Sequence, residues 1–268
     1  MGEGTPGSSS RLSLSLIRDF ELRRGDTVLE VAPIAQRLIG FLALQGNRSV
    51  RRAYVSGSLW LDAPESRASA SLRSAIWRSP TCNGAPLVGA SNTHLWLQPD
   101  LKVDLHAAAE RARRVLDLPS LDASSVDINR ELSDYADDVL VGWYDEWVIA
   151  ERERFRQLRL HVLDQLGELL LRAHRYSEAV QVGLVAVASE PLRESAHRLL
   201  VRAHLCEGNL AEALRQYRTY ADLLARELRV RPSAAMEGLI SDAMTGASTS
   251  AWGTETRMAK ALSPPAAG

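Results

Sequence analysis

The sequence is poor in cysteine, in lysine and in aromatic residues, and it has no long apolar run. Only two of its 268 residues are cysteine, Cys82 and Cys206, which excludes a disulfide scaffold and favours a reducing compartment. No stretch approaches the roughly 20 apolar residues that a membrane-spanning helix needs. Residues 1–10 lack the basic and apolar regions of a secretory signal. These absences predict a cytoplasmic protein without a membrane partner.

Catalytic and cofactor motifs are also missing. The chain has no glycine-rich phosphate loop, no GxGxxG after a strand, no HExxH and no CxxC. His197 and His204 lie seven residues apart, and we interpret them as a partly exposed pair on one helix face, not as metal ligands. We therefore expect no enzyme activity, no cofactor and no metal. An enzyme would require an unrecognised pocket in the concave face of a helical repeat.

Charge divides the chain into two regions. Residues 11–105 hold 12 basic against 8 acidic side chains, a net charge of +4, whereas residues 106–240 hold 18 against 22, a net charge of −4. Apolar residues make up 46% of the chain, which is enough for a globular core. The asymmetry suggests that the two regions meet different partners.

The first region combines strand and helix patterns. Apolar residues alternate over 12–31, which is typical of two or three short antiparallel strands. Helical periodicity follows over 34–44, 50–59 and 65–79, and Pro80 ends the third helix. Residues 87–97 then form a hairpin. This order of strands, three helices and hairpin is that of a winged helix.

The third of these helices is the candidate DNA-binding element. Leu72 and Ile76 are expected to face the core, and four polar residues recur on the outer side. These four are Arg67, Ser71, Ser74 and Arg78. Arginine forms bidentate hydrogen bonds with guanine and ion pairs with phosphate, and residues 48–78 carry a net charge of +4.

The residues expected to contact DNA come from two helices and the hairpin tip. They are Arg51, Arg52, Arg67, Ser69, Arg73, Ser74, Trp77, Arg78, Asn92, Thr93 and His94. Two alternatives stay open. In the first, the third helix is an ordinary solvated amphipathic helix. In the second, Trp77 packs beneath the hairpin instead of lying against sugar and phosphate.

The second region is helical and contains a repeat. Residues 104–116 form one helix, residues 117–133 have a linker composition, and the chain is helical in period from 134 to 240. Residues 175–180 and 209–214 match at a spacing of 34, with alanine at equivalent positions. This period is typical of tetratricopeptide repeats, in which stacked helix pairs complete one another's core. We expect a helix around 143–160 to act as a degenerate first unit.

An aromatic and acidic cluster lies at the start of this helical region. Trp143, Tyr144 and Trp147 fall within a stretch that carries seven acidic residues between Asp134 and Glu153. We interpret the tryptophans as core and the acidic residues as a solvated face, because large aromatics at helical spacing are usually buried. The alternative is a docking surface for a basic partner.

Several motifs resemble a known family. Residues 19–22 (DFEL), 35–44 (AQRLIGFLAL), 72–78 (LRSAIWR) and 103–105 (VDL) resemble the OmpR-like winged-helix domain of SARP-type (antibiotic regulatory protein) activators. Residues 138–147 (DVLVGWYDEW), 151–160 (ERERFRQLRL), 190–198 (EPLRESAHR) and 213–217 (ALRQY) resemble the bacterial transcriptional activation domain of the same family.

The resemblance implies a two-domain activator that binds direct repeats in promoter DNA, as a homodimer on the DNA. It also implies contact with RNA polymerase through sigma region 4 and the alpha C-terminal domain, with the beta flap as a further candidate. The targets that it implies are genes of specialised (antibiotic) metabolism. The expected location of the protein is the cytoplasm, in association with the nucleoid.

We therefore predict a mostly α protein with a small β part, a winged helix-turn-helix followed by an all-α tetratricopeptide-like domain. The expected parts are a flexible start (1–10), the winged helix (11–105), a connecting helix and linker (106–133), the activation domain (134–240) and a flexible tail (241–268). Two other functions stay open. One is a protein-interaction adaptor, and the other is a repressor with weak DNA binding.

Overall fold

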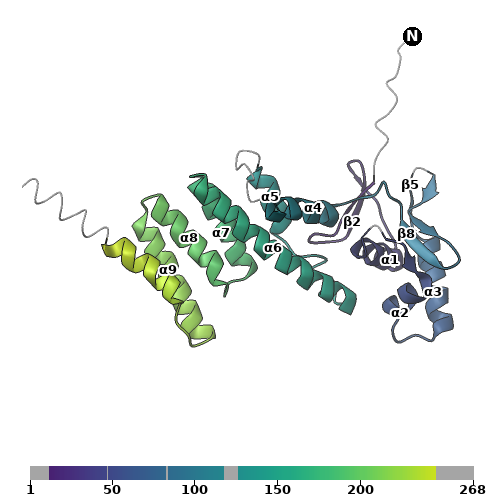
Figure 1. Ribbon diagram of the computed structural model, residues 1–268. Coiled ribbons are helices and arrows are strands. Elements are labelled where there is room, and N and C mark those ends of the chain that lie inside the picture. Colours follow the sequence, from purple (N-terminus) through teal and green to yellow (C-terminus); the bar gives the residue numbers. More distant parts are fainter. Residues whose placement is uncertain (1–11, 47, 83, 118–125, 246–268) are drawn as a thin grey trace, which may run out of the picture. The chain divides into compact units, whose positions relative to one another are not determined.

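The computed structural model describes residues 12–46, 48–82, 84–117 and 126–245, which fall into two compact units (Figure 1). The first unit takes in the chain up to residue 119 together with residues 129–161. The second takes in residues 120–128 and the chain from 162 onward. The boundary at 161 falls inside helix α6. The functional boundaries expected at 105 and 134 stay predictions, because these units are defined by packing alone.

The expected N-terminal strands form a sheet in the first unit. Its order is β3-β2-β1-β9, with β1 antiparallel to β2 and parallel to β9. The strands are β1 (Leu12–Ser15), β2 (Glu21–Arg24), β3 (Thr27–Val28) and β9 (Lys102–Val103). Leu12, Leu14 and Leu16 are fully buried, which confirms that the alternating pattern marks a strand with one face in the core.

Three helices and a second sheet complete the winged helix. The helices are α1 (Pro33–Leu44), α2 (Arg52–Leu59) and α3 (Glu65–Trp77), and the sheet has the order β4-β8-β7. Its strands are β4 (Val50–Arg51), β7 (Val88–Ala90) and β8 (His94–Leu97), and a small hairpin of β5 (Thr81–Cys82) and β6 (Ala85–Pro86) lies in the chain between α3 and β7. The antiparallel β7–β8 hairpin, residues 88–97, is called the wing below. The predicted winged helix is thus confirmed.

Two predicted helix bounds are wrong by two residues. The helix expected from residue 50 begins at Arg52, because Val50 and Arg51 pair with Leu95 and His94 of the wing. The helix expected to reach residue 79 ends at Trp77, with Arg78 as its C-cap. Proline at position 80 disfavours helical geometry in the residue before it, so the last turn closes early.

Residues 136–145 are not helical, so the expectation of nearly continuous helix from residue 134 is wrong there. The Leu140 N–H donates to the Leu16 carbonyl at 2.9 Å, and Val139 forms a bridge with Ile17. The Arg152 side chain donates to the carbonyls of Val139, Leu140 and Trp143. The backbone contacts tie the segment to the end of β1, and those of Arg152 tie it to the helix that follows. The flanking helices are α4 (Asp104–Asp117), α5 (Ile128–Tyr135) and α6 (Glu146–Arg172).

The interpretation of the aromatic cluster as core is correct only in part. Trp143 and Trp147 are half-buried and pack against the winged helix, whereas Tyr144 is exposed. The Trp147 ring meets Phe41 of α1 edge to face, with ring centroids 5.2 Å apart. Trp143 stacks on Phe20 at 6.1 Å and lies over Gly40 of α1. Trp143 precedes α6 and is not part of it, so the helix expected from residue 143 begins three residues later.

Helical repeats form the second unit. The part of α6 from residue 162 onward is followed by α7 (Tyr176–Ser189), α8 (Glu194–Cys206), α9 (Leu210–Glu227) and a helix over residues 234–245. Helix α7 packs on α8, and α8 packs on α9. The helix over 234–245 includes the first five residues of the predicted tail. The remainder of that tail and the predicted flexible start lie outside the described residues.

The 34-residue period is confirmed by equivalent backbone geometry. Ala179 and Ala213 are fully buried at matching positions near the starts of α7 and α9. His174 and Gly208, also 34 residues apart, both have positive φ, 58° and 78°. Each sits in the turn before a repeat helix, where left-handed geometry ends the preceding helix.

The expectation that His197 and His204 form a partly exposed pair is wrong for His197, which is 2% exposed. Its ring stacks on Tyr220 at a centroid distance of 4.2 Å and hydrogen-bonds the Pro191 carbonyl and the Gln216 side chain. Burial lowers the pKa of His197, because the charged imidazolium loses its hydration. In the described parts of the chain, no group of three His, Cys, Asp or Glu residues could hold a metal ion.

Candidate nucleic-acid interface

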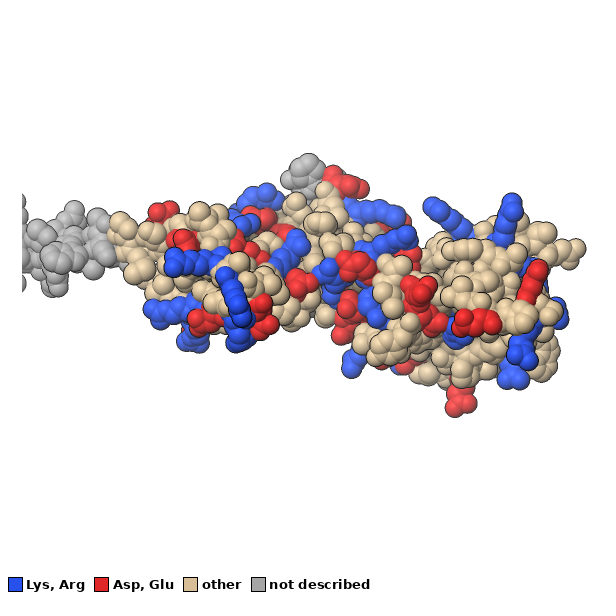
Figure 2. All heavy atoms as spheres, turned by 90° about the horizontal axis from the view of Figure 1, so that it is seen from below, with Lys and Arg blue, Asp and Glu red and all other residues tan. Residues whose placement is uncertain are grey.

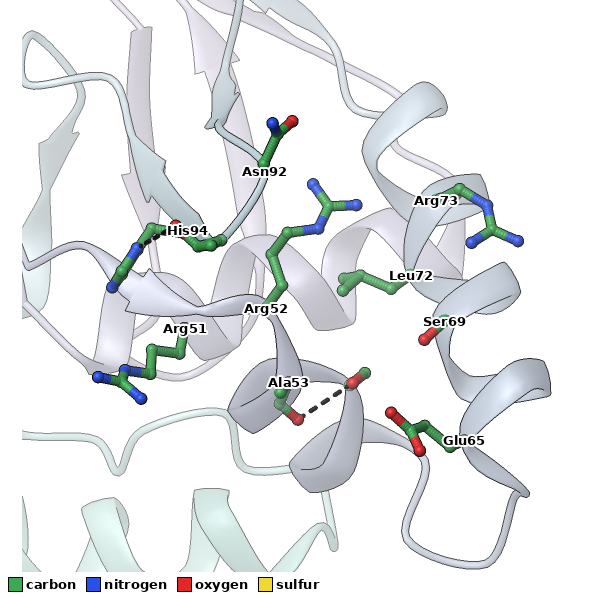
Figure 3. Close-up of a pocket in the computed structure, with 11 residues that line it drawn as sticks. Arg51, Arg52, Ala53, Glu65, Ser69, Leu72, Arg73, Asn92 and His94 are labelled. Atoms are coloured by element: carbon green, nitrogen blue, oxygen red, sulfur yellow. Dashed lines mark hydrogen bonds between the residues drawn. The ribbon is translucent and has the colours of Figure 1, made fainter.

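A groove of about 580 Å³ opens between the wing tip, the start of α2 and one flank of α3 (Figure 3). We call it the wing groove. It brings together seven of the eleven residues expected to contact DNA: Arg51, Arg52, Ser69, Arg73, Asn92, Thr93 and His94. Ala53, Ser56, Glu65 and Leu72 complete its lining. Residues more than 40 positions apart in the sequence therefore share one surface.

The wing tip is held in place by the start of α2. The backbone N–H of Arg52 donates to the Thr93 carbonyl at 2.9 Å, and its guanidinium donates to the Ser91 carbonyl at 3.3 Å. The Ser91 hydroxyl accepts the backbone N–H groups of Thr93 and His94. The polar side chains of the tip are thus presented from a hydrogen-bonded turn. In Figure 3, the Arg52 side chain extends into the space between the wing and α3.

Helix α3 has one buried stripe and two exposed flanks. Ala68, Leu72 and Ala75 are buried at helical spacing, which confirms the core role of Leu72, whereas Ile76 is only half-buried. Ser69 and Arg73 lie on the flank that lines the wing groove. Arg67, Ser74 and Arg78 fall on the other flank by helical geometry. The structure therefore separates two sets of residues that were expected to act together.

Trp77 lies between the two flanks and is 84% exposed. This exposure excludes the alternative in which Trp77 packs beneath the hairpin. An indole this exposed on a helix is uncommon, because large aromatic side chains are usually well buried.

Charge on the winged helix is mixed. Figure 2 shows basic and acidic side chains interspersed on the visible face of this unit. The lining of the wing groove includes three arginines and, among the described residues, a single carboxylate, that of Glu65. Glu65 is not among the residues that the sequence predicts to contact DNA. Its spacing of four residues from Ser69 and of eight from Arg73 is the signal that could have identified it.

A second hollow, of about 510 Å³, adjoins the loop between α2 and α3. Its lining includes Arg67 and the segment from Tyr144 to Trp147. Arg37 bridges the two sides, because its guanidinium donates to the Asp145 carboxylate at 2.5 Å and to the Leu59 carbonyl at 3.1 Å. Tyr144 is 82% exposed here. The docking surface suggested for the aromatic and acidic cluster falls on this hollow and stays a prediction.

Asp104 fixes the sheet to the helices that follow the winged helix. Its carboxylate accepts the backbone N–H groups of Leu16 at 2.9 Å, Ile17 at 3.2 Å and Leu105 at 2.6 Å. Burial raises the pKa of Asp104, and these three hydrogen bonds oppose the shift. The role of this residue in the 103–105 motif is therefore to join β1 to the start of α4.

Comparisons with known proteins are consistent with both units. The family model "bacterial transcriptional activator domain" matches residues 100–242. Regulatory protein AfsR of Streptomyces coelicolor is 30% identical over 226 residues, covering 81% of this chain and 22% of that protein. Regulatory protein AfsR of Streptomyces griseus is 28% identical over 235 residues, covering 85% of this chain and 24% of that protein. The chain therefore spans about a quarter of the length of these relatives.

A similar solved structure is that of Mycobacterium tuberculosis EmbR in complex with a low-affinity phosphopeptide. Its TM-score is 0.67 at 22% identity, with 92% of this chain and 71% of that chain covered. This likeness concerns the fold, a winged helix with a helical domain. Among the described helices, none is both long and apolar enough to cross a membrane.

Proposed function

The chain belongs to the SARP-type transcriptional activators, which carry a bacterial transcriptional activator domain, and we propose that it binds promoter DNA through the wing groove and α3. The observation that carries this proposal is that Arg51, Arg52 and Arg73 line one open groove together with the wing tip. A groove lined by arginines is suited to a polyanion, because each phosphate contact releases condensed counterions.

In this proposal, α3 enters the major groove and the wing contacts the neighbouring backbone. Arg73 forms a bidentate hydrogen bond with guanine, and Arg51 and Arg52 bind phosphate. Asn92, Thr93 and His94 contact sugar and phosphate from the wing. The remaining predicted residues, Arg67, Ser74, Trp77 and Arg78, approach the other side of the same groove from the far flank of α3.

The rest of the proposal concerns partners. We propose that the protein binds direct repeats as a homodimer on the DNA, within the nucleoid, and controls genes of specialised (antibiotic) metabolism. The helical half recruits RNA polymerase through sigma region 4, the alpha C-terminal domain or the beta flap. The match of residues 100–242 to the activator-domain family supports this division of labour.

The test is a binding titration of the full chain with a duplex selected from a randomised pool. We expect Arg73→Ala to weaken binding to the selected duplex by roughly 1–3 kcal/mol. Arg113→Ala removes an exposed arginine of α4 outside the wing groove and is expected to change binding by less than about 0.5 kcal/mol. Affinity of the unmodified chain should also fall steeply with salt.

The outcomes separate the candidate functions. Equal affinities for Arg73→Ala and the unmodified chain would remove Arg73 from the interface. A chain that enriches no sequence and binds without salt dependence would instead be an adaptor. Transcription in vitro with the selected promoter distinguishes an activator, which raises transcript yield, from a repressor, which lowers it.

A further inference from the structure

Glu65 is an unexpected residue in the wing groove. Among the described residues that line the groove it is the only acidic one, and Arg51, Arg52 and Arg73 share that lining. Glu65 is exposed, and no hydrogen bond or ion pair is found between its carboxylate and another described residue. In Figure 3 the carboxylate projects from the first turn of α3 toward α2. A groove that served only to hold phosphate would be weakened by this charge.

The position of Glu65 along α3 aligns it with Ser69 and Arg73. The three residues follow one another at intervals of four, so they form one ridge of the helix on the groove flank. A helix rises 1.5 Å per residue, which places Glu65 and Arg73 about 12 Å apart along the axis. Bases along a strand are spaced about 3.4 Å apart. The two side chains therefore address positions roughly two to four base pairs apart.

The chemistry of a carboxylate limits what it can meet in DNA. An ionised carboxylate only accepts hydrogen bonds. In the major groove, guanine presents two acceptors, thymine an acceptor and a methyl group, and adenine a donor beside the N7 acceptor. Cytosine presents only its N4 amino donor. Cytosine is thus the one base edge that offers the carboxylate a partner without a neighbouring acceptor.

We infer that Glu65 is a specificity-determining residue that accepts a hydrogen bond from N4 of a cytosine, two to four base pairs from the guanine contacted by Arg73. This inference rests on the proposed function, because it assigns one contact within the proposed DNA interface. The negative charge lowers affinity for every duplex and lowers it least where a cytosine amino group faces the carboxylate. Glu65 therefore selects by penalising the other bases.

The experiment is selection from randomised duplexes with the full chain and three variants. Glu65→Ala is expected to lose the preference for cytosine at one position, by roughly five-fold to a hundred-fold. Glu65→Gln is expected to move the preference at that position toward adenine, because a carboxamide pairs with the N6 and N7 atoms of adenine. Preferences at the other positions should stay as in the unmodified chain.

Asp62→Asn is the matched control. Asp62 is an exposed carboxylate three residues before Glu65, in the loop before α3, and it does not line the wing groove. Both Asp62→Asn and Glu65→Gln remove one negative charge, so both should raise affinity for unselected DNA to a similar extent. Only the Glu65 variants should change base preference. Thermal midpoints of all variants report on the separate effect of Glu65 on the N-terminus of α3.

The result that overturns the inference is an unchanged base preference in Glu65→Ala and Glu65→Gln. In that case the residue acts only as a general repulsive charge. A different result, in which the unmodified chain enriches no sequence, would overturn the proposed function itself. The two failures are therefore distinguishable within one experiment.

Discussion

The two units of this protein are built from contacts of different range. In the first unit, β1 pairs with β9 nearly 90 residues later, and residues 138–141 return to the end of β1. In the second, α7 packs on α8 and α8 on α9, each on its neighbour in sequence. The first unit therefore needs a segment from the helical half of the chain to complete it, whereas the repeat unit is assembled from adjacent helix pairs.

Because of this difference, the winged helix depends on residues 143–147 for its packing, which the sequence motifs did not indicate. If residues 143–147 were absent, Phe20 would lose its contact with Trp143, and Phe41 would lose Trp147 and keep only Tyr54 as a described aromatic neighbour. The link from Asp145 through Arg37 to the end of α2 would be lost as well. The segment that resembles an activation domain thus packs on α1 and is linked to the end of α2, within the winged helix.

The largest expected effect tests that dependence. Trp143→Ala should destabilise the first unit by about 2–4 kcal/mol, because a half-buried indole leaves a cavity over Gly40. Hydrogen exchange should show lost protection in residues 12–103 but not in residues 176–227. The adjacent, largely exposed Tyr144 is the control, since Tyr144→Ala should leave protection unchanged. Equal loss of protection in both units would refute the separation of the molecule into two units.

A smaller effect is expected at a close approach in the second unit. A methyl group at Gly167 would overlap the buried side chain of Leu199 in α8. We expect Gly167→Ala to destabilise this unit by about 1–3 kcal/mol, since overpacking outweighs the gain in helix propensity.

Gly238 provides the matched comparison, because nothing lies within 4 Å of a methyl group placed there. Gly238→Ala should therefore stabilise the protein by about 0.5–1 kcal/mol. Chemical denaturation of both variants measures the difference. A stabilising Gly167→Ala would mean that α6 and α8 are not closely packed.

The smallest effect concerns pH and also belongs to the second unit. The pKa of His197 is lowered from its ordinary value of 6.5 by burial. The unfolded chain therefore binds a proton more readily than the folded chain as the pH falls through 6.5. The stability associated with neutral His197 is present above pH 6.5 and is lost progressively below it.

Denaturation of the full chain between pH 7.5 and 5 checks this expectation. The unmodified chain should lose stability over this interval, and His197→Gln should show a shallower dependence. Hydrogen-exchange protection of the first unit serves as the internal control, because the loss of stability at low pH is expected only in helices α7 to α9. An identical pH dependence in the two chains would contradict it.

Prediction from sequence succeeded where a local period carries the information. The alternation of Leu12, Leu14 and Leu16 marked β1, and the 34-residue spacing of Ala179 and Ala213 marked the repeat. Prediction was less accurate at ends and turns. Arg51 forms part of a strand because it meets His94 of the wing, and that partner is more than 40 residues away. His197 was misjudged for a related reason, since Tyr220 of another helix covers it.

The sequence by itself determined which faces are apolar, the order of the strands and helices of the winged helix and that a repeat follows it, because these features depend on neighbouring residues. Only the tertiary structure decided which seven of the eleven DNA-contact candidates share a groove, that Glu65 joins them, and that Trp143 and Trp147 support α1. Those outcomes depend on the approach of segments far apart in the chain. Such approaches follow from the packing of whole surfaces, which no local period of the sequence encodes.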